Sequence, residues 1–250
     1  MKQILTSLAG TLILGGLLWS PGAAAQDFNR SYAMGGGGHV RIGNVSGDVI
    51  VTGYNGDTII VRGFREGRDR DRIQVEDLST GDRVDVRVKY PENCNCDASI
   101  RFEVNVPRSV SYNFDRLASV SGEVEVTGVS GQLKAESVSG NVLIKDVEGQ
   151  VSASTVSGNV NAEITRIEGA GSMKFSAVSG NVNVRAPANL DADIEMSTVS
   201  GSLKTDFPIE VQERRYGPGR SARGRLGNGA NNLRITTVSG RVSLNGVKLE

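Results

Sequence analysis

The sequence predicts an all-β fold, a single-stranded parallel β-helix (β-solenoid) with about two short strands in each coil of 18–22 residues. Three observations predict it. The triplet Val-Ser-Gly occurs eight times, aliphatic and polar residues alternate after its glycine, and the 250 residues include 32 glycines but only 5% aromatics. Such a composition builds a thin aliphatic core with tight corners. A right-handed coil is expected, since parallel crossovers are right-handed by default.

The first element is a signal peptide over residues 1–25. Lys2 precedes an apolar run from Ile4 to Trp19, and small residues at 23–25 suit a signal peptidase, so Gln26 begins the mature chain. A transmembrane anchor is the alternative, but three glycines and a proline interrupt or follow the run. No later segment approaches the about 20 apolar residues that span a bilayer, so no anchor is expected after removal of the signal. The protein is therefore expected to be exported, to the periplasm or to the cell surface and beyond.

The next two elements lead into the repeats. Residues 26–39 are expected to be a flexible segment, and residues 40–115 an irregular β region that leads into or caps the solenoid. Within that region Val45-Ser46-Gly47 already resembles the start of a coil. The stretches 82–90 and 99–106 alternate strictly between polar and apolar residues, which predicts two half-buried strands.

Residues 116–250 hold the regular repeats. After Gly140, for example, Val142 and Ile144 are two apart and so share one face of a strand, while Asn141 lies on the other. The triplet's valine is expected to join the buried face, giving about three buried side chains per nine-residue unit. That is too little to hold nine ordered residues alone, so neighbouring units must stack.

A coarser period sets the coils. Triplets preceded by small or hydroxyl residues begin at Val120, Val138, Val156, Val178, Val199 and Val238, at intervals of 18, 18, 22, 21 and 39 residues. Sequential stacking of these coils would form a serine ladder with asparagines 141, 159 and 181 beside it. An antiparallel meander with Ser-Gly hairpin turns is the competing fold. The residues assigned to the structural repeat are Ser121, Gly122, Ser139, Gly140, Ser157, Gly158, Ser179, Gly180, Ser200, Gly201, Ser239 and Gly240.

The longest interval contains a basic insertion, at about residues 208–232. It has no acid between positions 214 and 225. Such a loop is a candidate site for the phosphate or carboxylate groups of a surface polymer, and a disordered loop without a ligand is the alternative. Nucleic acid is not an expected partner, because Tyr216 is the only aromatic there and the mature net charge is 27 minus 28, or minus one. The candidate residues are Arg214, Arg215, Arg220, Arg223 and Arg225.

Cysteine and acid–base chemistry are sparse. Cys94 and Cys96 are the only cysteines, and a disulfide between them is the default in an exported protein, although the ring is small. With His39 as the sole histidine, no usual zinc spacing or serine–histidine pair can be assembled. A chance pair among the outer acids at 123, 125, 136 and 146 remains open, and none stands out. No catalytic, metal-binding or cofactor-binding residue is assigned, and no cofactor is expected.

These residues also carry a resemblance. The run from Val104-Asn-Val-Pro107 to Ser119-Val-Ser-Gly122, together with the repeated Val-Ser-Gly-Asn-Val, resembles the bacterial putative-adhesin family of β-strand-repeat domains, whose function is unknown. The resemblance covers about residues 40–250 and implies a single-stranded β-helix. It implies no catalytic residues, and the basic insertion departs from the family's plain repeat.

The sequence thus favours an exported, non-catalytic β-solenoid that acts as an adhesin or binding module at the bacterial cell envelope. Its regularly spaced polar groups match a repeating polymer, such as an envelope or extracellular polysaccharide. A β-helix enzyme that acts on polysaccharide and a self-assembling envelope scaffold are the two alternatives. A clustered Asp, Lys and Arg constellation in a groove would favour the enzyme, and polymerisation through the end coils would favour the scaffold.

Overall fold

The computed structural model describes residues 27–209, 211–213 and 219–247, and over this part the chain is all-β. Its one helical element is the 3-10 turn η1 (Arg70–Arg72). The expected signal peptide, Gln26, Arg214 and Arg215 lie outside the described residues. The strands are β1 (Phe28–Tyr32), β2 (His39–Gly43), β3 (Val49–Tyr54), β4 (Ile59–Glu66), β5 (Gln74–Asp77), β6 (Arg83–Lys89), β7 (Ser99–Pro107), β8 (Ser111–Ser121), β9 (Val124–Thr127), β10 (Ser130–Ser139), β11 (Val142–Ser157), β12 (Val160–Arg166), β13 (Ser172–Ser179), β14 (Val182–Pro187), β15 (Ala192–Ser200), β16 (Leu203–Thr205), β17 (Val211–Glu213), β18 (Arg220–Leu226), β19 (Asn231–Ser239) and β20 (Val242–Val247).

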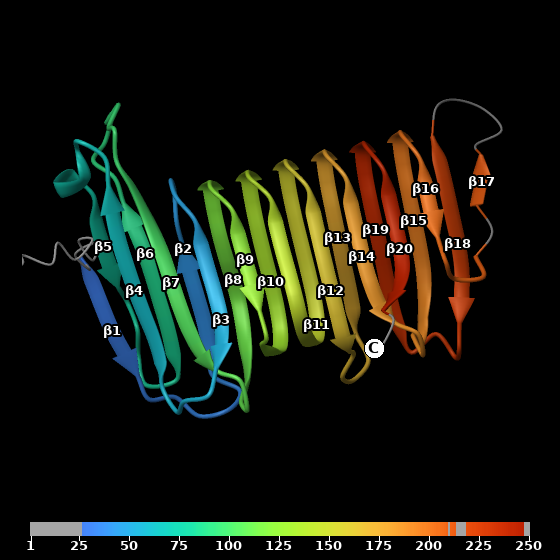
Figure 1. The fold of residues 1–250 in the computed structure, drawn as a ribbon, viewed down its shortest axis with the longest axis horizontal. Coiled ribbons are helices and arrows are strands. Elements are labelled where there is room, and N and C mark those ends of the chain that lie inside the picture. Colours follow the sequence, from blue (N-terminus) through green and yellow to red (C-terminus); the bar gives the residue numbers. More distant parts are fainter. Residues whose placement is uncertain (1–26, 210, 214–218, 248–250) are drawn as a thin grey trace, which may run out of the picture.

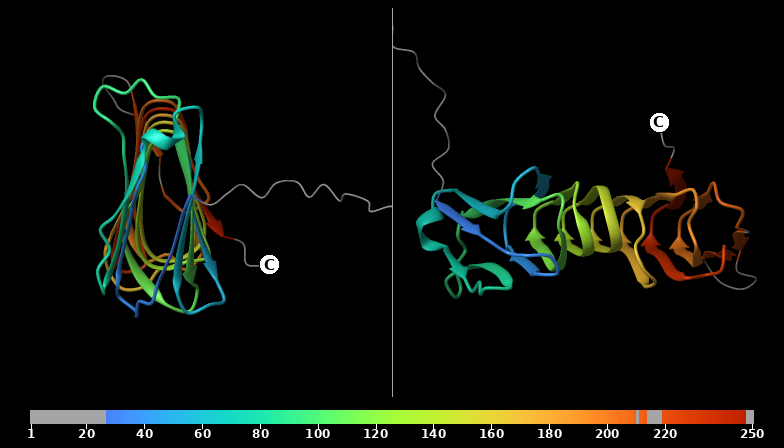
Figure 2. Two further views of the ribbon diagram at one scale, coloured as in Figure 1. Left: turned by 90° about the vertical axis from the view of Figure 1, so that its left-hand side faces the viewer. Right: turned by 90° about the horizontal axis from the view of Figure 1, so that it is seen from below.

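The strands form one continuous sheet that is folded into two faces around a narrow interior (Figures 1 and 2). Face A runs in the order β5, β6, β2, β8, β10, the second half of β11, β13, β19, β15, β18 and β17. Face B runs in the order β1, β4, β7, β3, β9, the first half of β11, β12, β14, β20 and β16. The molecule is therefore an elongated, solenoid-like rod.

Neighbouring coils in the middle of the rod pair in parallel and in register. Gly131 lies opposite Gly149 and Val142 opposite Val124, each 18 residues away, as the double period predicts. The antiparallel meander is wrong for these coils, because β8, β10, β11 and β13 all pair in parallel. Antiparallel pairs occur instead at the two ends of the rod, between β1, β4 and β7, between β5 and β6, and between β15, β18 and β17.

Alternating aliphatic side chains fill the interior, as the two-residue period predicts. Val124, Val126, Val142 and Ile144 are all buried. The expectation that the triplet valines are also buried is wrong for seven of the eight. Only Val129 of these triplets is buried, whereas the valines that begin each coil are 40–47% exposed. They stand at the corner between the two faces, where the alternation of face A carries them outward.

The coils do not stack in sequence order at either end. The serine ladder keeps its predicted order from Ser139 to Ser157 to Ser179, but the next member is Ser239, and Ser200 follows it. The expectation that Ser179 and Ser200 are neighbours in the serine ladder is therefore wrong. The last coil, β19–β20, is inserted between β13–β14 and β15–β16. The first coil, β2–β3, is likewise inserted between β6–β7 and β8–β9.

Two segments expected to be loops or flexible contain strands. The insertion at 208–232 includes β17 and β18, and β18 pairs antiparallel with β15 along seven residues from Thr198 to Ala192. The strand covers the open edge of β15, which would otherwise expose its backbone groups. Within residues 26–39, β1 pairs with β4 and buries Phe28 against the core. Pairing with the edge of β15 thus orders the insertion, and pairing with β4 together with burial of Phe28 orders the N-terminal segment.

Candidate functional site

The repeated glycines form a column in which coils approach backbone to backbone. A Cβ atom on Gly140 would lie 2.0 Å from the carbonyl oxygen of Gly122, and one on Gly180 would lie 1.8 Å from that of Gly158. No side chain fits such a space. The glycines of the structural repeat therefore set the close spacing of the corners, and their role is architectural.

A buried hydroxyl group from the next coil satisfies most of these glycine carbonyl groups. Ser137 Oγ donates to Gly122 O at 2.8 Å, and Thr155 Oγ1 donates to Gly140 O at 2.8 Å. Thr237 Oγ1 donates to Gly180 O at 2.9 Å. In this hydroxyl ladder Ala177 takes the position between Thr155 and Thr237, and it brings no hydroxyl to Gly158 O.

Side-chain amides satisfy the backbone N–H groups just beyond the glycines. Asn141 Oδ1 accepts from the N–H of Asn159 at 3.0 Å, and Asn159 Oδ1 accepts from the N–H of Asn181 at 2.9 Å. Asn181 Oδ1 then accepts from the N–H of Arg241 at 2.8 Å. The asparagines that sequence analysis placed beside the serines form this asparagine ladder.

A concave feature with many polar side chains lies on face A, across β8, β10, β11 and β13. It is an open groove of about 530 Å³, which we call the face A groove. Its walls carry outward-pointing groups from successive strands, which sequence analysis did not single out individually although their alternation marks them as exposed. They are Gln132, Lys134, Glu136, Gln150, Ser152, Ser154, Ser172, Lys174 and Ser176.

Charge in this groove is unevenly distributed. Glu136 lies 2.9 Å from Lys134 Nζ and 2.8 Å from Arg116 Nε. Partial burial would raise the pKa of Glu136, but these two cations outweigh burial and hold the pKa below its usual value. Lys174 has no ion-pair partner among the described residues and is exposed. The groove therefore offers amide and hydroxyl groups, the two paired acids Asp115 and Glu136, and a lysine that can contact a ligand.

The arginine candidates Arg223 and Arg225 face acids of the neighbouring strand and, together with them, line an open groove of about 620 Å³. Arg225 forms two hydrogen bonds to the carboxylate of Asp193, at 2.6 and 3.0 Å, and Arg223 binds Glu195 at 2.8 Å. Both acids have a lowered pKa, with the hydrogen bond from the arginine as the main cause. Arg220 Nη1 donates to the carbonyl of Gly201 at 2.7 Å. The described arginines thus hold β18 onto β15, and their charge is largely offset there.

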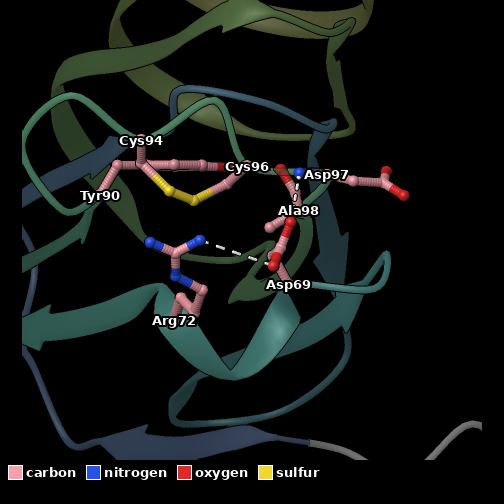
Figure 3. Close-up of a disulfide and its surroundings, with 7 residues drawn as sticks. All are labelled: Asp69, Arg72, Tyr90, Cys94, Cys96, Asp97 and Ala98. Carbon is pink, nitrogen blue, oxygen red and sulfur yellow. Dashed lines mark hydrogen bonds and ion pairs between the residues drawn. A yellow bond between two sulfur atoms is a disulfide. The ribbon is translucent and has the colours of Figure 1, made fainter.

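Cys94 and Cys96 are joined by a disulfide in the loop between β6 and β7 (Figure 3). The loop is held against the turn after β4. Asp69 accepts a hydrogen bond from the N–H of Asp97 at 2.9 Å, and Arg68 binds the carboxylate of Asp97 at 2.8 Å. The disulfide lies at one end of the rod, away from the face A groove, and its surroundings are those of a structural link.

Candidate metal ligands and the histidine are dispersed over the described ranges. These ranges contain no cluster of three or more His, Cys, Asp or Glu side chains that could hold a metal ion. His39 lies in β2 and contacts Asp115 at 2.9 Å, so the expectation that it is flexible is wrong. The outer acids are spread over both faces: Glu123 contacts Asn141 just before β11, and Glu125 contacts Lys145 of β11 on face B, whereas Glu136 lies on face A. Asp146 contacts Arg108. None of the helices that the structure describes could cross a bilayer.

Comparison with known proteins gives one family. The Toastrack DUF4097 model matches residues 38–245, a span that contains every inner coil of the rod. No curated protein matches the chain.

Solved structures give distant likenesses. A putative cell adhesion protein from Clostridium sporogenes is 9% identical, with 88% of this chain and 99% of that chain covered and a TM-score of 0.48. A putative adhesin from Bacteroides fragilis is 13% identical, with 88% and 96% covered and a TM-score of 0.29. A putative lipid binding protein from Parabacteroides distasonis is 12% identical, with the same coverage and a TM-score of 0.28.

Proposed function

The chain belongs to the Toastrack DUF4097 family, and with that premise we propose that it is an exported, non-catalytic binding module of the bacterial cell envelope. Its ligand is an extended, hydroxyl-rich polymer, such as an envelope polysaccharide, which lies in the face A groove. Export rests on the signal-like pattern of residues 1–25. The underlying fold is a right-handed, single-stranded parallel β-helix with two strands per coil.

The observation that carries the proposal is the repetition of hydrogen-bonding groups along the groove. Gln132 lies opposite Gln150 on adjacent strands, and Ser152 lies opposite Lys174. Adjacent strands are about 4.8 Å apart, so donors and acceptors recur at a fixed short interval along the rod. A polymer with regularly spaced hydroxyl groups can pair with such a series. A small compact ligand would use only a fraction of it.

A binding assay with matched variants tests the proposal. We would measure the affinity of the purified protein for a panel of envelope polysaccharides and for whole cells. The variants are Gln132→Ala with Lys174→Ala on face A, and Lys204→Ala on face B as the control for loss of an exposed lysine. We expect the face A double variant to bind at least about tenfold more weakly, since it loses a charged and a neutral hydrogen bond. The control should bind like the wild type.

Two outcomes would contradict the proposal. Binding that is equal in the wild type and the face A variant would place the ligand elsewhere. Steady release of cleaved sugar from any of the polysaccharides would favour the enzyme alternative, because the proposed module has no turnover. Folding of each variant is checked by circular dichroism and thermal unfolding, so that lost binding is not confused with lost structure.

A further inference from the structure

Seven exposed valines form a single row along the corner between the two faces. In spatial order they are Val45, Val120, Val138, Val156, Val178, Val238 and Val199, each on the strand next to the previous one. All are 40–47% exposed. With strands about 4.8 Å apart the row is about 29 Å long. In Figure 1 it follows the upper edge, where the arrowheads of β8, β10, β13, β19 and β15 line up.

The strip beside the valine row is uncharged over most of its length. On one side the row is flanked by the exposed serines of the structural repeat, from Ser139 onward to Ser200. On the other side the residue two positions before each valine is Ser154, Ser176, Thr236 or Ser197. From β11 to β15 the row is therefore methyl groups between small hydroxyl groups. Core packing does not require the methyl groups there, since these side chains remain exposed.

The other end of the row differs, because three arginines gather there. Arg41 of β2 lies opposite Arg116 of β8, and Arg87 of β6 lies opposite Gly43. These arginines and the first four valines line an open groove of about 430 Å³, which we call the arginine groove. Gly43 and Ala118 also line it, and their small side chains leave room between the arginines and the valines.

The arginine groove has unbalanced positive charge. Arg87 is paired with Asp85 through two hydrogen bonds of 2.8 and 2.6 Å, and Arg116 is paired with Glu136 at 2.8 Å. Arg41 has no acidic partner within ion-pair distance in the part of the chain that the structure describes. Its guanidinium is partly exposed and can form paired hydrogen bonds to a carboxylate.

We propose that this strip binds a single-chain anionic amphiphile, a long-chain carboxylate. Its carboxylate binds Arg41 in the arginine groove, and its alkyl chain extends along the valine row toward β13. The positive charge of Arg41 is complementary to a negatively charged head group and places that head group in the arginine groove. The uncharged row beyond β10 selects the chain, because a charged polymer would leave its own groups unpaired there. This site adjoins the proposed polymer site, with Glu136 and Ser154 lining both grooves, but the proposal does not depend on polymer binding.

Binding of soluble fatty acids below their critical micelle concentration tests the proposal. We would titrate the purified protein with dodecanoate, hexanoate and the neutral amphiphile dodecyl maltoside, using isothermal calorimetry. Dodecanoate should bind at least about 30-fold more tightly than hexanoate, since six more methylenes contact the row and each fully buried methylene strengthens binding about fourfold. Dodecyl maltoside should bind at least about tenfold more weakly than dodecanoate, because it lacks the charged hydrogen bonds.

Two pairs of variants locate the site. Arg41→Ala should weaken dodecanoate at least about tenfold and leave dodecyl maltoside unchanged, whereas Arg185→Ala on face B should change neither. Val138→Ser with Val156→Ser should remove the difference between dodecanoate and hexanoate. Leu78→Ser, at an exposed apolar residue off the row, should preserve it. All five positions are partly or largely exposed, so the variants are expected to fold.

Three results would overturn the proposal. One is the absence of dodecanoate binding, and another is equal affinity for dodecanoate and hexanoate. The third is binding to anionic phospholipid vesicles without binding of monomeric dodecanoate, which would make a membrane surface the partner. None of these results bears on polysaccharide binding, which the face A variants test by themselves.

Discussion

The middle of the rod and its two ends are held together by different chemistry. In the middle, from β10 to β14, neutral hydroxyl and asparagine ladders satisfy the corner backbone, and the coils follow one another in sequence order. At the ends the sequence order breaks, antiparallel strands cover the open edges, and ion pairs such as Arg225–Asp193 and Arg68–Asp97 hold the cover in place. The regular coils thus have neutral corner ladders in addition to ion pairs between coils, such as Arg185–Glu163, whereas the closing strand β18 is held by edge hydrogen bonds and ion pairs.

The largest expected effect comes from breaking the close contact of the middle coils. Gly140→Ala would place a Cβ atom 2.0 Å from the carbonyl oxygen of Gly122, so the two coils must separate. We expect the free energy of unfolding to fall by at least about 3 kcal/mol, measured by urea denaturation. Gly81→Ala is the control, because nothing lies within 4 Å of its added Cβ atom. Equal stability of the two variants would show that the corners are more adaptable than their geometry indicates.

A smaller effect follows from editing the hydroxyl ladder in both directions. Thr155→Val leaves Gly140 O without its buried donor and should cost about 1–2 kcal/mol of unfolding free energy. Ala177→Ser supplies the missing donor to Gly158 O and should add about 0.5–1 kcal/mol. Both are measured by thermal and urea unfolding. A destabilised Ala177→Ser protein would mean that Ala177 is selected for space and that the ladder ends there for a steric reason.

The third expected effect is a local loss of stability at low pH, and it distinguishes the ends of the rod from the middle. Hydrogen bonds from the N–H groups of Ala230 and Gly229 lower the pKa of Asp191, and Arg225 lowers that of Asp193. Because the folded-state pKa of each is below its unfolded value, the stability that they contribute is present above about pH 4 and is lost as the pH falls through the folded pKa. Hydrogen exchange at pH 3 against pH 6, corrected for intrinsic rates, should show β18 and β19 opening before β10–β12.

The control for this effect removes one negative charge by mutation, without lowering the pH. Asp191→Asn should expose β19 to exchange at pH 6 while β10–β12 keep their protection, since their ladders carry no charge. If the middle coils opened first at low pH, the neutral corner ladders would not be what protects the middle of the rod.

The repeat pattern predicted the strand pairing in the middle of the rod. It failed at the ends, where the coil that packs beside a given coil is not the next one in the sequence. The two-residue alternation after Gly140 correctly assigned Val142 and Ile144 to the core, and the 18-residue period gave their partners. The same pattern misassigned Val138, because strand alternation on face A continues to the corner and carries that valine outward. A corner residue belongs to the strand before it, and only coordinates show where the strand ends.

Spacing alone could not reveal the inserted coils or the use of the arginines. The 39-residue interval before Val238 shows that something long intervenes, but not that the chain returns to fill the place between Ser179 and Ser200. The arginines of β18 belong to a stretch of the sequence that contains no acid. The acids that pair with them, Asp193 and Glu195, belong to an earlier strand. The arginine groove arises in the same way, from β2, β6 and β8, which are distant in sequence.

The inserted first and last coils also determine how such a rod can change length during evolution. Duplication at either terminus of the gene would not extend the stack, since neither terminal coil lies at an outer edge. Duplication of an inner cassette, such as the 18 residues that separate Gly140 from Gly158, would add one coil and leave both closures intact. Relatives with longer rods should therefore carry their additional cassettes between β10 and β13.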